Sequence, residues 1–398
     1  MKKLSFFILI TFTLFGINDV LADEIEKNVD NAHFDDLPHW EHTLQTTPEG
    51  KWGYIDTTGK VVIELQFKYA GHFSEGLAMI EKDNKYGFIN KKGEVVIEPE
   101  FDAARYFSEG LAAVEIDGKF GYIDKAGDIV IEPEFDEAGR FSEGLAVVKE
   151  NRGYGYIDKT GKMVIRAQFN DAGDFHEGLA WAEEPGIITR GLRKIRGRRG
   201  YIDKRGKWVI EPQLKSACDF SEGLAKVWTY RNWGYIDKKG EWVIKPQFEW
   251  SEYRPEELTL VDIKKRAWLR NKYYYIDIEF NMDTFSDGLA RIIKEDSFAF
   301  IDKTGEIIIE SNFDFAGKFS EGLAAVKENG KWGYIDTSGQ IIIEPGFDNV
   351  GDFSEGLAAA RKNSKHGFID KKGAWVIEPG FDWAWDFSEG LAAVMIKN

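Results

Sequence analysis

The stretch KWGYIDTSGQIIIEPGFDNVGDFSEGLAAARKNS, residues 331–364, is one copy of a unit that recurs along almost the whole 398-residue chain. Its most regular part is the motif Phe-Ser-Glu-Gly-Leu-Ala, which recurs with at most one replacement and mostly at steps of 34 residues. A degenerate copy at 254–259 falls in the longest step, so we count about ten copies. Such a period is the signature of a repeat array. The motif begins at Phe73, Phe107, Phe141, Phe175, Phe220, Phe285, Phe319, Phe353 and Phe387.

Each unit predicts three β-strands. The Trp-Gly-Tyr-Ile segment is short, aromatic and β-branched, and the following Asp-x-x-Gly fits a type I turn. The run 95–97 then returns as the second arm of a hairpin, and Pro99 is expected to end it because proline has no N–H. About ten residues later, 111–114 form the Leu-Ala strand, and a turn such as Asn329-Gly330 leads into the next Trp-Gly. The units should therefore be antiparallel meanders.

The recurring apolar residues have an expected packing role. Phe101 and Phe107 flank the crossing segment and should insert between neighbouring meanders, at about 1.5–3 kcal/mol for each buried Phe. The small Ala112-Ala113 pair allows adjacent sheets to approach closely. Stability should then be a sum of terms for single units and for their junctions.

The order of these motifs resembles that of the WG-repeat family, bacterial β-rich arrays named for the Trp-Gly pair. The resemblance extends from Lys51 to Asn398 and rests on Trp-Gly-Tyr-Ile-Asp, on Ile-Glu-Pro-x-Phe, and on Phe-Ser-Glu-Gly-Leu-Ala. It implies a module more than a catalyst, and it implies no particular activity.

The fold class that we expect is all-β, with tandem 34-residue meanders in an open superhelical, solenoid-like array. The alternative is a closed propeller-like ring, in which the first Trp-Gly strand at Trp52 pairs with the last Leu-Ala strand at 391–397. The open array is favoured because the predicted units have three strands and ten units exceed the number in common propellers.

The chain divides into three parts. Residues 1–22 resemble a signal peptide, with Lys2 and Lys3 before a short apolar run, so we expect export to the periplasm or the outside of the cell. Residues 23–50 are a capping segment before the repeats, and 51–398 form the array, which is degenerate around 242–285. The mature chain has no transmembrane candidate, and its single Cys218 excludes an internal disulfide. The net charge of −16 disfavours nucleic-acid partners.

Two repeated acidic positions are candidate ligand sites. The Glu of Phe-Ser-Glu-Gly, as in Glu75, could form a ladder that binds cations, but a role in turn geometry is the preferred interpretation. The Asp of Asp-x-x-Gly, as in Asp56, lacks the dense oxygen pattern of a calcium loop, so we expect it to cap its own turn. No metal, cofactor or catalytic arrangement is predicted, and we expect a protein that is not an enzyme.

Two basic segments depart from the repeat. Eleven extra residues lie around 185–199, and a second departure lies between 258 and 285. Both are read as connections from a Leu-Ala strand to the next Trp-Gly strand, so they should project from one edge and bind an anionic envelope polymer or an acidic protein. Solvated loops are the alternative. The binding candidates are Arg190, Arg193, Lys194, Arg196, Arg198, Arg199, Lys264, Lys265, Arg266, Trp268 and Arg270.

The sequence therefore predicts an exported, non-catalytic binding scaffold for protein or envelope partners. The alternative is a module that binds carbohydrate or cell-wall polymer, because the many Trp and Tyr side chains could stack on sugars. Most Trp residues occupy strand positions and should be buried. The best candidates for exposed Trp are Trp250, Trp268, Trp383 and Trp385.

Overall fold

Each repeat folds into a small antiparallel sheet whose strands follow one another in chain order. The structure is a computed structural model. The residues that it describes lie in one unit, which is formed by 45–252 together with 280–398. The described ranges are 50–151, 153–186, 197–229, 232–249, 284–294, 297–310 and 313–397.

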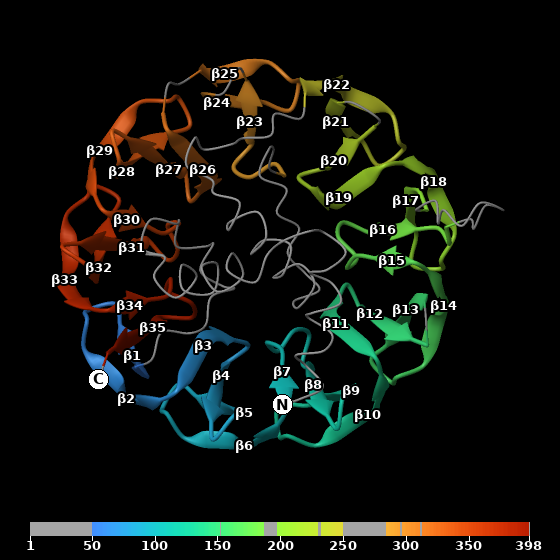
Figure 1. The fold of residues 1–398 in the computed structure, drawn as a ribbon, viewed down its shortest axis with the longest axis horizontal. Coiled ribbons are helices and arrows are strands. Elements are labelled where there is room, and N and C mark those ends of the chain that lie inside the picture. Colours follow the sequence, from blue (N-terminus) through green and yellow to red (C-terminus); the bar gives the residue numbers. More distant parts are fainter. Residues whose placement is uncertain are drawn as a thin grey trace, which may run out of the picture. The chain divides into compact units, whose positions relative to one another are not determined.

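Strands occupy four positions in a sheet, here named inner, second, third and outer from the ring axis outward (Figure 1). The inner strands are β3 (Tyr69–Ser74), β7 (Ala103–Ala104), β11 (Glu137–Ser142), β15 (Asp171–Ala172), β19 (Ser216–Ser221), β26 (Phe315–Ser320), β30 (Asn349–Val350) and β34 (Trp383–Ala384). The second strands are β4 (Leu77–Lys82), β8 (Ala112–Ile116), β12 (Leu145–Glu150), β16 (Ala180–Glu183), β20 (Leu224–Trp228), β23 (Ala290–Lys294), β27 (Leu323–Glu328), β31 (Leu357–Lys362) and β35 (Leu391–Ile396).

The Trp-Gly segments form the third strands, and the Ile-Glu-Pro segments form the outer strands. The third strands are β1 (Lys51–Asp56), β5 (Lys85–Asn90), β9 (Lys119–Ile123), β13 (Gly153–Asp158), β17 (Arg199–Ile202), β21 (Asn232–Ile236), β24 (Ser297–Ile301), β28 (Lys331–Asp336) and β32 (Lys365–Asp370). The outer strands are β2 (Val61–Phe67), β6 (Val95–Phe101), β10 (Ile129–Phe135), β14 (Met163–Phe169), β18 (Trp208–Leu214), β22 (Trp242–Glu249), β25 (Ile307–Glu310), β29 (Ile341–Phe347) and β33 (Trp375–Phe381).

The ring is closed, so the prediction of an open superhelical array is wrong and the propeller-like alternative is correct. β1, the first described strand, pairs antiparallel with β35, the last, from Lys51 opposite Ile396 to Asp56 opposite Leu391. The closing sheet therefore has the order β2-β1-β35-β34 and combines both ends of the described chain. Figure 1 shows the blue and red strands side by side in this sheet. Pairing the two ends leaves no exposed terminal sheet in the described ring.

The described residues form nine sheets, whereas the sequence predicts about ten copies. The degenerate copy at 254–259 lies outside the described residues. The sheets on either side of that copy, β19–β22 and β23–β25, contact one another as other neighbours do. The Ser221 hydroxyl donates to the Phe285 carbonyl at 2.8 Å, and Lys303 pairs with Glu222 at 3.0 Å. These two sheets are therefore direct neighbours in the described ring.

The predicted three-strand meander is confirmed, but sequence reasoning missed the inner strand. Part of the crossing segment pairs with the second strand, as β3 does with β4. The expectation that Pro99 ends its strand is also wrong, because β6 continues to Phe101. Since β6 is an edge strand, the missing N–H of Pro99 breaks no ladder bond. No helix in the described part of the chain has the length and apolarity needed to cross a bilayer.

The glycine of the Trp-Gly pair is required by close backbone approach. A Cβ on Gly53 would lie 2.5 Å from the Ile63 carbonyl oxygen of the outer strand. The third and outer strands shift register at this point, which brings the two backbones together. The sheet β23–β25 has Ala299 at this position, and there Ala299 pairs with Glu310 without that shift. The signature glycine therefore allows a bulged pairing of the third and outer strands.

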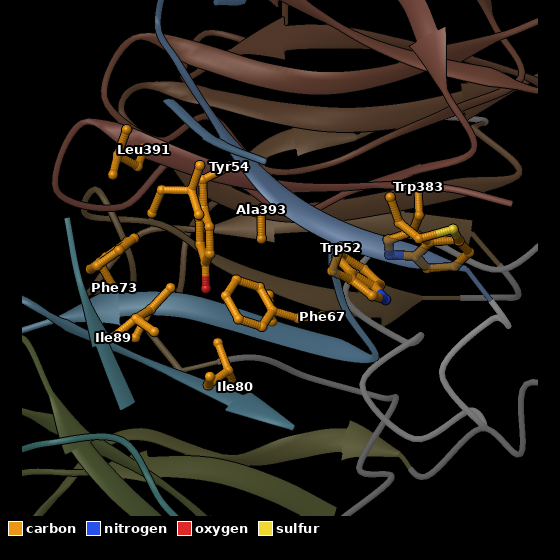
Figure 2. Close-up of a cluster of buried hydrophobic side chains, with 13 residues drawn as sticks. Trp52, Tyr54, Phe67, Phe73, Ile80, Ile89, Trp383, Leu391 and Ala393 are labelled. Atoms are coloured by element: carbon orange, nitrogen blue, oxygen red, sulfur yellow. The ribbon is translucent and has the colours of Figure 1, made fainter. Parts of the chain in front are cut away.

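Apolar side chains fill the space between neighbouring sheets. Figure 2 shows the core between the closing sheet and β3–β6, in which Tyr54, Phe67 and Phe73 converge with Ile80 and Ile89. These side chains are at most 7% exposed. Equivalent clusters recur at the other junctions, so the predicted role of the recurring aromatics in holding sheets together is confirmed.

Candidate binding surface: the inner rim of the ring

The Glu of Phe-Ser-Glu-Gly connects each sheet to the next. Glu75 accepts a hydrogen bond from the N–H of Gly110 at 2.9 Å and pairs with Lys125 at 3.1 Å. The same Gly N–H bond joins every neighbouring pair of the nine described sheets, with Asp287 in place of Glu at one junction. We name this circle of bonds the carboxylate belt. The belt has a structural role, which is the interpretation that the sequence analysis preferred. Its bonds, however, link neighbouring sheets in addition to shaping the local turn.

The electrostatics of the carboxylate belt favour ionised carboxylates. For Glu75, partial burial raises the pKa, but the Lys125 ammonium and the Gly110 N–H outweigh it and hold the pKa below its usual value. The same direction and causes hold for Glu143, Glu177, Glu321 and Glu389 with their own partners. The belt therefore holds its charges through paired contacts between sheets.

The Ser and aromatic residues of the motif are also used between sheets. Ser108 donates to the Phe141 carbonyl of the next sheet at 2.7 Å. The Tyr122 ring lies 4.9 Å from the Phe141 ring, and its hydroxyl donates to the Gly139 carbonyl at 2.9 Å. The aromatic pair recurs at every junction among the described sheets. These side chains therefore have structural roles at the junctions between sheets.

The Asp-x-x-Gly turns have the predicted local geometry. The Asp56 carboxylate accepts hydrogen bonds from the N–H groups of Thr58 and Lys60, at 2.9 and 3.1 Å. Gly59 has a φ of +84°, which the turn requires. The interpretation of this Asp as a turn cap is confirmed.

The residue before the motif Phe differs between sheets, although the Phe beside it recurs in all nine described sheets. We name this position in the nine sheets the inner rim, because it lies on the innermost segment of each sheet (Figure 1). Neighbouring side chains of the rim meet: Arg140 Nε lies 3.3 Å from Asp174 Oδ2, and Lys318 Nζ lies 3.7 Å from Asp352 Oδ2. Its members are His72, Tyr106, Arg140, Asp174, Asp219, Thr284, Lys318, Asp352 and Asp386.

One part of the inner rim is polar and charged. His176, which replaces the motif Ser, places Nε2 at 3.5 Å from Asp219 Oδ2. Burial raises the pKa of Asp174, and Arg140 and His176 act in the opposite direction. Burial also raises the pKa of Asp386 to about 7. In the described part of the chain, no three His, Cys, Asp or Glu side chains come together as a metal site.

Two rim residues, His72 and Tyr106, belong to an aromatic group that also includes Tyr69 and Trp385 and that spans the closing sheet and the next two sheets. The His72 ring stacks on the Tyr106 ring at 3.7 Å, and the hydroxyls of Tyr69 and Tyr106 lie 3.3 Å apart. Trp385 stacks on the buried Trp52 at 6.0 Å. His72 is exposed, while Tyr69, Tyr106 and Trp385 are half-buried. We name these four residues, His72, Tyr69, Tyr106 and Trp385, the aromatic arc.

Most of the predicted basic binding residues cannot be placed. Arg190, Arg193, Lys194, Arg196, Lys264, Lys265, Arg266, Trp268 and Arg270 lie outside the described residues. Arg198 donates to the Gln213 carbonyl at 3.0 Å.

Arg199 has a packing role. Its guanidinium lies 4.0 Å from the Trp181 ring centroid and 3.1 Å from Asp171 Oδ2. This side chain is mostly buried and therefore unsuited to a large anionic partner.

Only the ends of the two departures from the repeat lie among the described residues. Described residues stop at Gly186 and resume at Gly197 between a second and a third strand, β16 and β17, as predicted. They stop again at Glu249, which ends the outer strand β22, and resume at Thr284 before the second strand β23. The second departure, between 258 and 285, lies almost wholly outside the described residues, so its predicted connection stays a prediction.

The predicted exposure of Trp side chains is only partly correct. Trp250 and Trp268 lie outside the described residues. Trp383 is 9% exposed and packs in the closing sheet, so its predicted exposure is wrong. Trp385 is half-buried. Trp242, which sequence reasoning missed, is 39% exposed on β22. Trp242 is the first residue of an edge strand, and this position was the signal from which its exposure could have been predicted.

A groove of about 510 Å³ lies beside the first departure from the repeat. Arg166, Gln168, Asn170 and Pro185 contribute to its lining. Ala167, also in the lining, stands where six other outer strands have Pro. The mixed polar lining shows no convergent set of groups for chemistry.

Comparison with solved structures shows a similarity in architecture. The chain is similar to a structure described as the crystal structure of the eukaryotic initiation factor, with 9% identity, 88% of this chain and 98% of that chain covered, and a TM-score of 0.53. Hsv2 of Kluyvelomyces marxianus matches at 9% identity over 79% of this chain and 96% of that chain, with a TM-score of 0.39. At such low identity, the first match shows a similar fold alone. No curated protein matches the sequence.

The family comparison covers most of the repeat region. The model described as WG containing repeat matches nine segments, which are 52–86, 86–120, 120–152, 154–184, 200–227, 233–254, 298–332, 332–365 and 367–398. The sequence resemblance is thereby confirmed. With its Trp-Gly glycines and junction aromatics in place around a ring of nine described sheets, this chain belongs to the WG-repeat family.

Proposed function

We propose that this protein is an exported, non-catalytic binding scaffold, and that its partners contact the inner rim. The observation that carries the proposal is a difference between positions of the repeat, because some recur and hold the sheets together while others vary from sheet to sheet. Tyr122, Phe141 and Glu75 represent positions that recur and are committed to junctions between sheets. The inner rim is the place where neighbouring sheets differ and still contact one another. Ligand specificity requires such asymmetry, which the repeated residues lack.

Export is part of this proposal and rests on the apolar segment before Ala22. The test is fractionation of cells that express the full chain, with the mature N-terminus read by mass spectrometry. Recovery outside the cytoplasm with cleavage after Ala22 is expected. A full-length chain in the cytoplasm would contradict export.

The partner can be a protein or an envelope polymer, and the mature chain should capture it from native envelope extract. The sharpest comparison uses variants at different positions of the inner rim. Arg140→Ala and Lys318→Ala change the charged part, and His72→Ala changes the aromatic part. At least one should reduce capture, while Val130→Ala, which removes a side chain that is 43% exposed on the outer strand, should not. Equal capture by all variants would contradict a role for the rim.

The basic segments remain a separate prediction for an anionic partner. Replacement of Arg193, Lys194, Arg196 and Arg198 by Ser should weaken binding to purified envelope fractions at low salt. Unchanged binding would remove these residues from the binding surface and leave the proposal for the inner rim intact.

A further inference from the structure

The aromatic arc differs in chemistry from the charged part of the inner rim. It gathers Tyr69, His72, Tyr106 and Trp385 from three neighbouring sheets. His72, Tyr106 and Trp385 stand at positions where most other sheets have Gly or a charged residue. None of the four side chains belongs to the repeated aromatic pairs that hold the sheets together. The arc is therefore an addition to the repeat, and its combination of residues has no counterpart elsewhere in the described ring.

The rings of the arc are held in place by contacts with one another. Tyr106 is fixed between the His72 ring at 3.7 Å and the Tyr69 hydroxyl at 3.3 Å. Trp52 lies 6.1 Å from Tyr69 and 6.0 Å from Trp385, and thus connects Trp385 to Tyr69. Trp52 and Trp383 are buried behind these rings, and Figure 2 shows both at this junction. Such support preorganises the surface and reduces the entropy lost on binding.

The arc is polar at its edges but carries no charge of its own at neutral pH. Desolvation of the imidazole, which stacks on the Tyr106 ring, lowers the pKa of His72 and keeps this side chain neutral. Burial also raises the pKa values of Tyr69 and Tyr106, so both phenols keep their protons. The nearby Lys68 ammonium is engaged by Glu81 and Asn84, each at 2.7 Å. A charged ligand would find little complementarity here.

Flat rings with hydroxyl and imidazole groups at their edges match the two kinds of surface that a sugar ring presents. The C–H face of a pyranose can stack on an aromatic ring, and its equatorial hydroxyls can exchange hydrogen bonds with Tyr and His. A purely apolar peptide side chain would leave those edge groups without partners on binding, which is costly. His72 is exposed and the other three rings are half-buried, so part of each ring is accessible to a ligand.

We propose that the aromatic arc is a binding platform for a neutral saccharide chain. This inference rests on the proposed binding function and names its ligand class. Each stacked ring adds only a small favourable contribution, so single sugars should bind weakly and longer oligomers more tightly.

The test is calorimetric titration of the mature chain with cellohexaose, chitohexaose and maltohexaose, with polygalacturonate as the anionic comparison. Binding of at least one neutral hexamer is expected. His72→Ala and Tyr106→Ala should each weaken it about three- to tenfold. The matched control is Val130→Ala, because Val130 lies on an outer strand, away from the inner rim, and is 43% exposed. This control should change affinity by less than about twofold, as expected for a distant site.

Unfolding in urea separates loss of the site from loss of the fold. His72→Ala should keep the wild-type midpoint, because its side chain is exposed. If no neutral hexamer binds at millimolar concentration, or if both arc variants bind as the wild type does, the inference is wrong. Binding of polygalacturonate alone, or of an extended peptide in a Tyr106-dependent manner, also overturns it. Capture of an envelope partner that is unaffected by His72→Ala and Tyr106→Ala but reduced by a charged-rim variant would overturn the saccharide platform and leave the proposed function standing.

Discussion

Glu389, near the C-terminus, accepts a hydrogen bond at 3.0 Å from the N–H of Gly76, which lies 313 residues earlier in the chain. The same carboxylate pairs with Lys91 at 3.0 Å. This junction has the contacts of the other junctions in the carboxylate belt. Ring closure therefore combines the paired strands β1 and β35 of the closing sheet with the same junction contacts that link the other sheets.

Glu389→Gln should destabilise the ring as much as the same change at an internal junction. The substitution keeps the shape but removes the charge that Gly76 and Lys91 recognise, at a cost of about 1 kcal/mol. Glu109→Gln is the matched variant, because Glu109 has Gly144 and Lys159 as equivalent partners, both at 3.0 Å. Urea unfolding measures both. If Glu389→Gln leaves the urea midpoint unchanged while Glu109→Gln lowers it, the result would indicate an open chain.

The carboxylate belt predicts acid sensitivity. The folded-state pKa of Glu75 and of Glu389 is lower than the ordinary value of 4.5, so the folded chain binds fewer protons than the unfolded chain. Their stabilising contribution is present above that ordinary value and is lost as the pH falls through the folded-state pKa. The urea concentration at the unfolding midpoint should therefore decrease as the pH is lowered below about 4.5. A midpoint that stays constant or rises towards pH 3 would contradict this role.

Asp386 should show the opposite dependence. Burial raises its pKa to about 7, so the folded state binds the extra proton between the ordinary value of 3.8 and about 7. Its stabilising contribution is complete below 3.8 and is lost as the pH rises through about 7. Asp386→Asn, which cannot ionise, should therefore gain stability relative to the wild type as the pH rises from about 4 to about 7, with little further change above that. Parallel profiles of unfolding free energy for the two proteins would show that this carboxyl does not titrate as described.

The Trp-Gly glycine should not tolerate even one methyl group. Gly53→Ala would place Cβ 2.5 Å from the Ile63 carbonyl oxygen and 2.8 Å from the Glu64 carbonyl oxygen, both backbone atoms. We expect a loss of about 2–3 kcal/mol in unfolding free energy. Gly346→Ala is the control, because its nearest neighbour would be the Glu344 carbonyl oxygen at 3.7 Å. It should be neutral, and equal effects of the two changes would refute the close-approach explanation.

The local parts of this fold could be predicted from the sequence because they depend on neighbouring residues. The Asp56 turn, the Asn329-Gly330 hairpin and the packing of Phe107 all follow from residue chemistry at fixed spacing. The inner strand was missed because some copies are as short as β7, with two residues, and carry no alternating pattern. Such a strand exists only because its neighbour offers a free edge.

Ring closure and the number of sheets could not be predicted in the same way. Both depend on the small angle between neighbouring sheets and on pairing between Trp52 and Met395, which no local pattern encodes. The aromatic arc was missed for a related reason. Tyr106 and Trp385 are 279 positions apart, and only the closed ring brings their sheets to either side of Tyr69.

The most direct test of the closed ring is a disulfide between its two ends. Lys51 and Ile396 are register partners in the closing sheet, and Lys51 is exposed while Ile396 is 44% exposed. Directly opposed residues in antiparallel strands have Cα atoms about 4.5–5.5 Å apart, within reach of a disulfide. The background is Cys218→Ser, and Lys331→Cys with Ile396→Cys is the control for two distant positions.

Mild oxidation of the dilute Lys51→Cys, Ile396→Cys protein, followed by peptide mapping, supplies the measurement. The closed ring predicts a nearly quantitative intramolecular disulfide between the first and last strands, and none in the control pair. An open array predicts free thiols or intermolecular disulfides in both proteins, and that result would contradict the fold on which the inner rim depends.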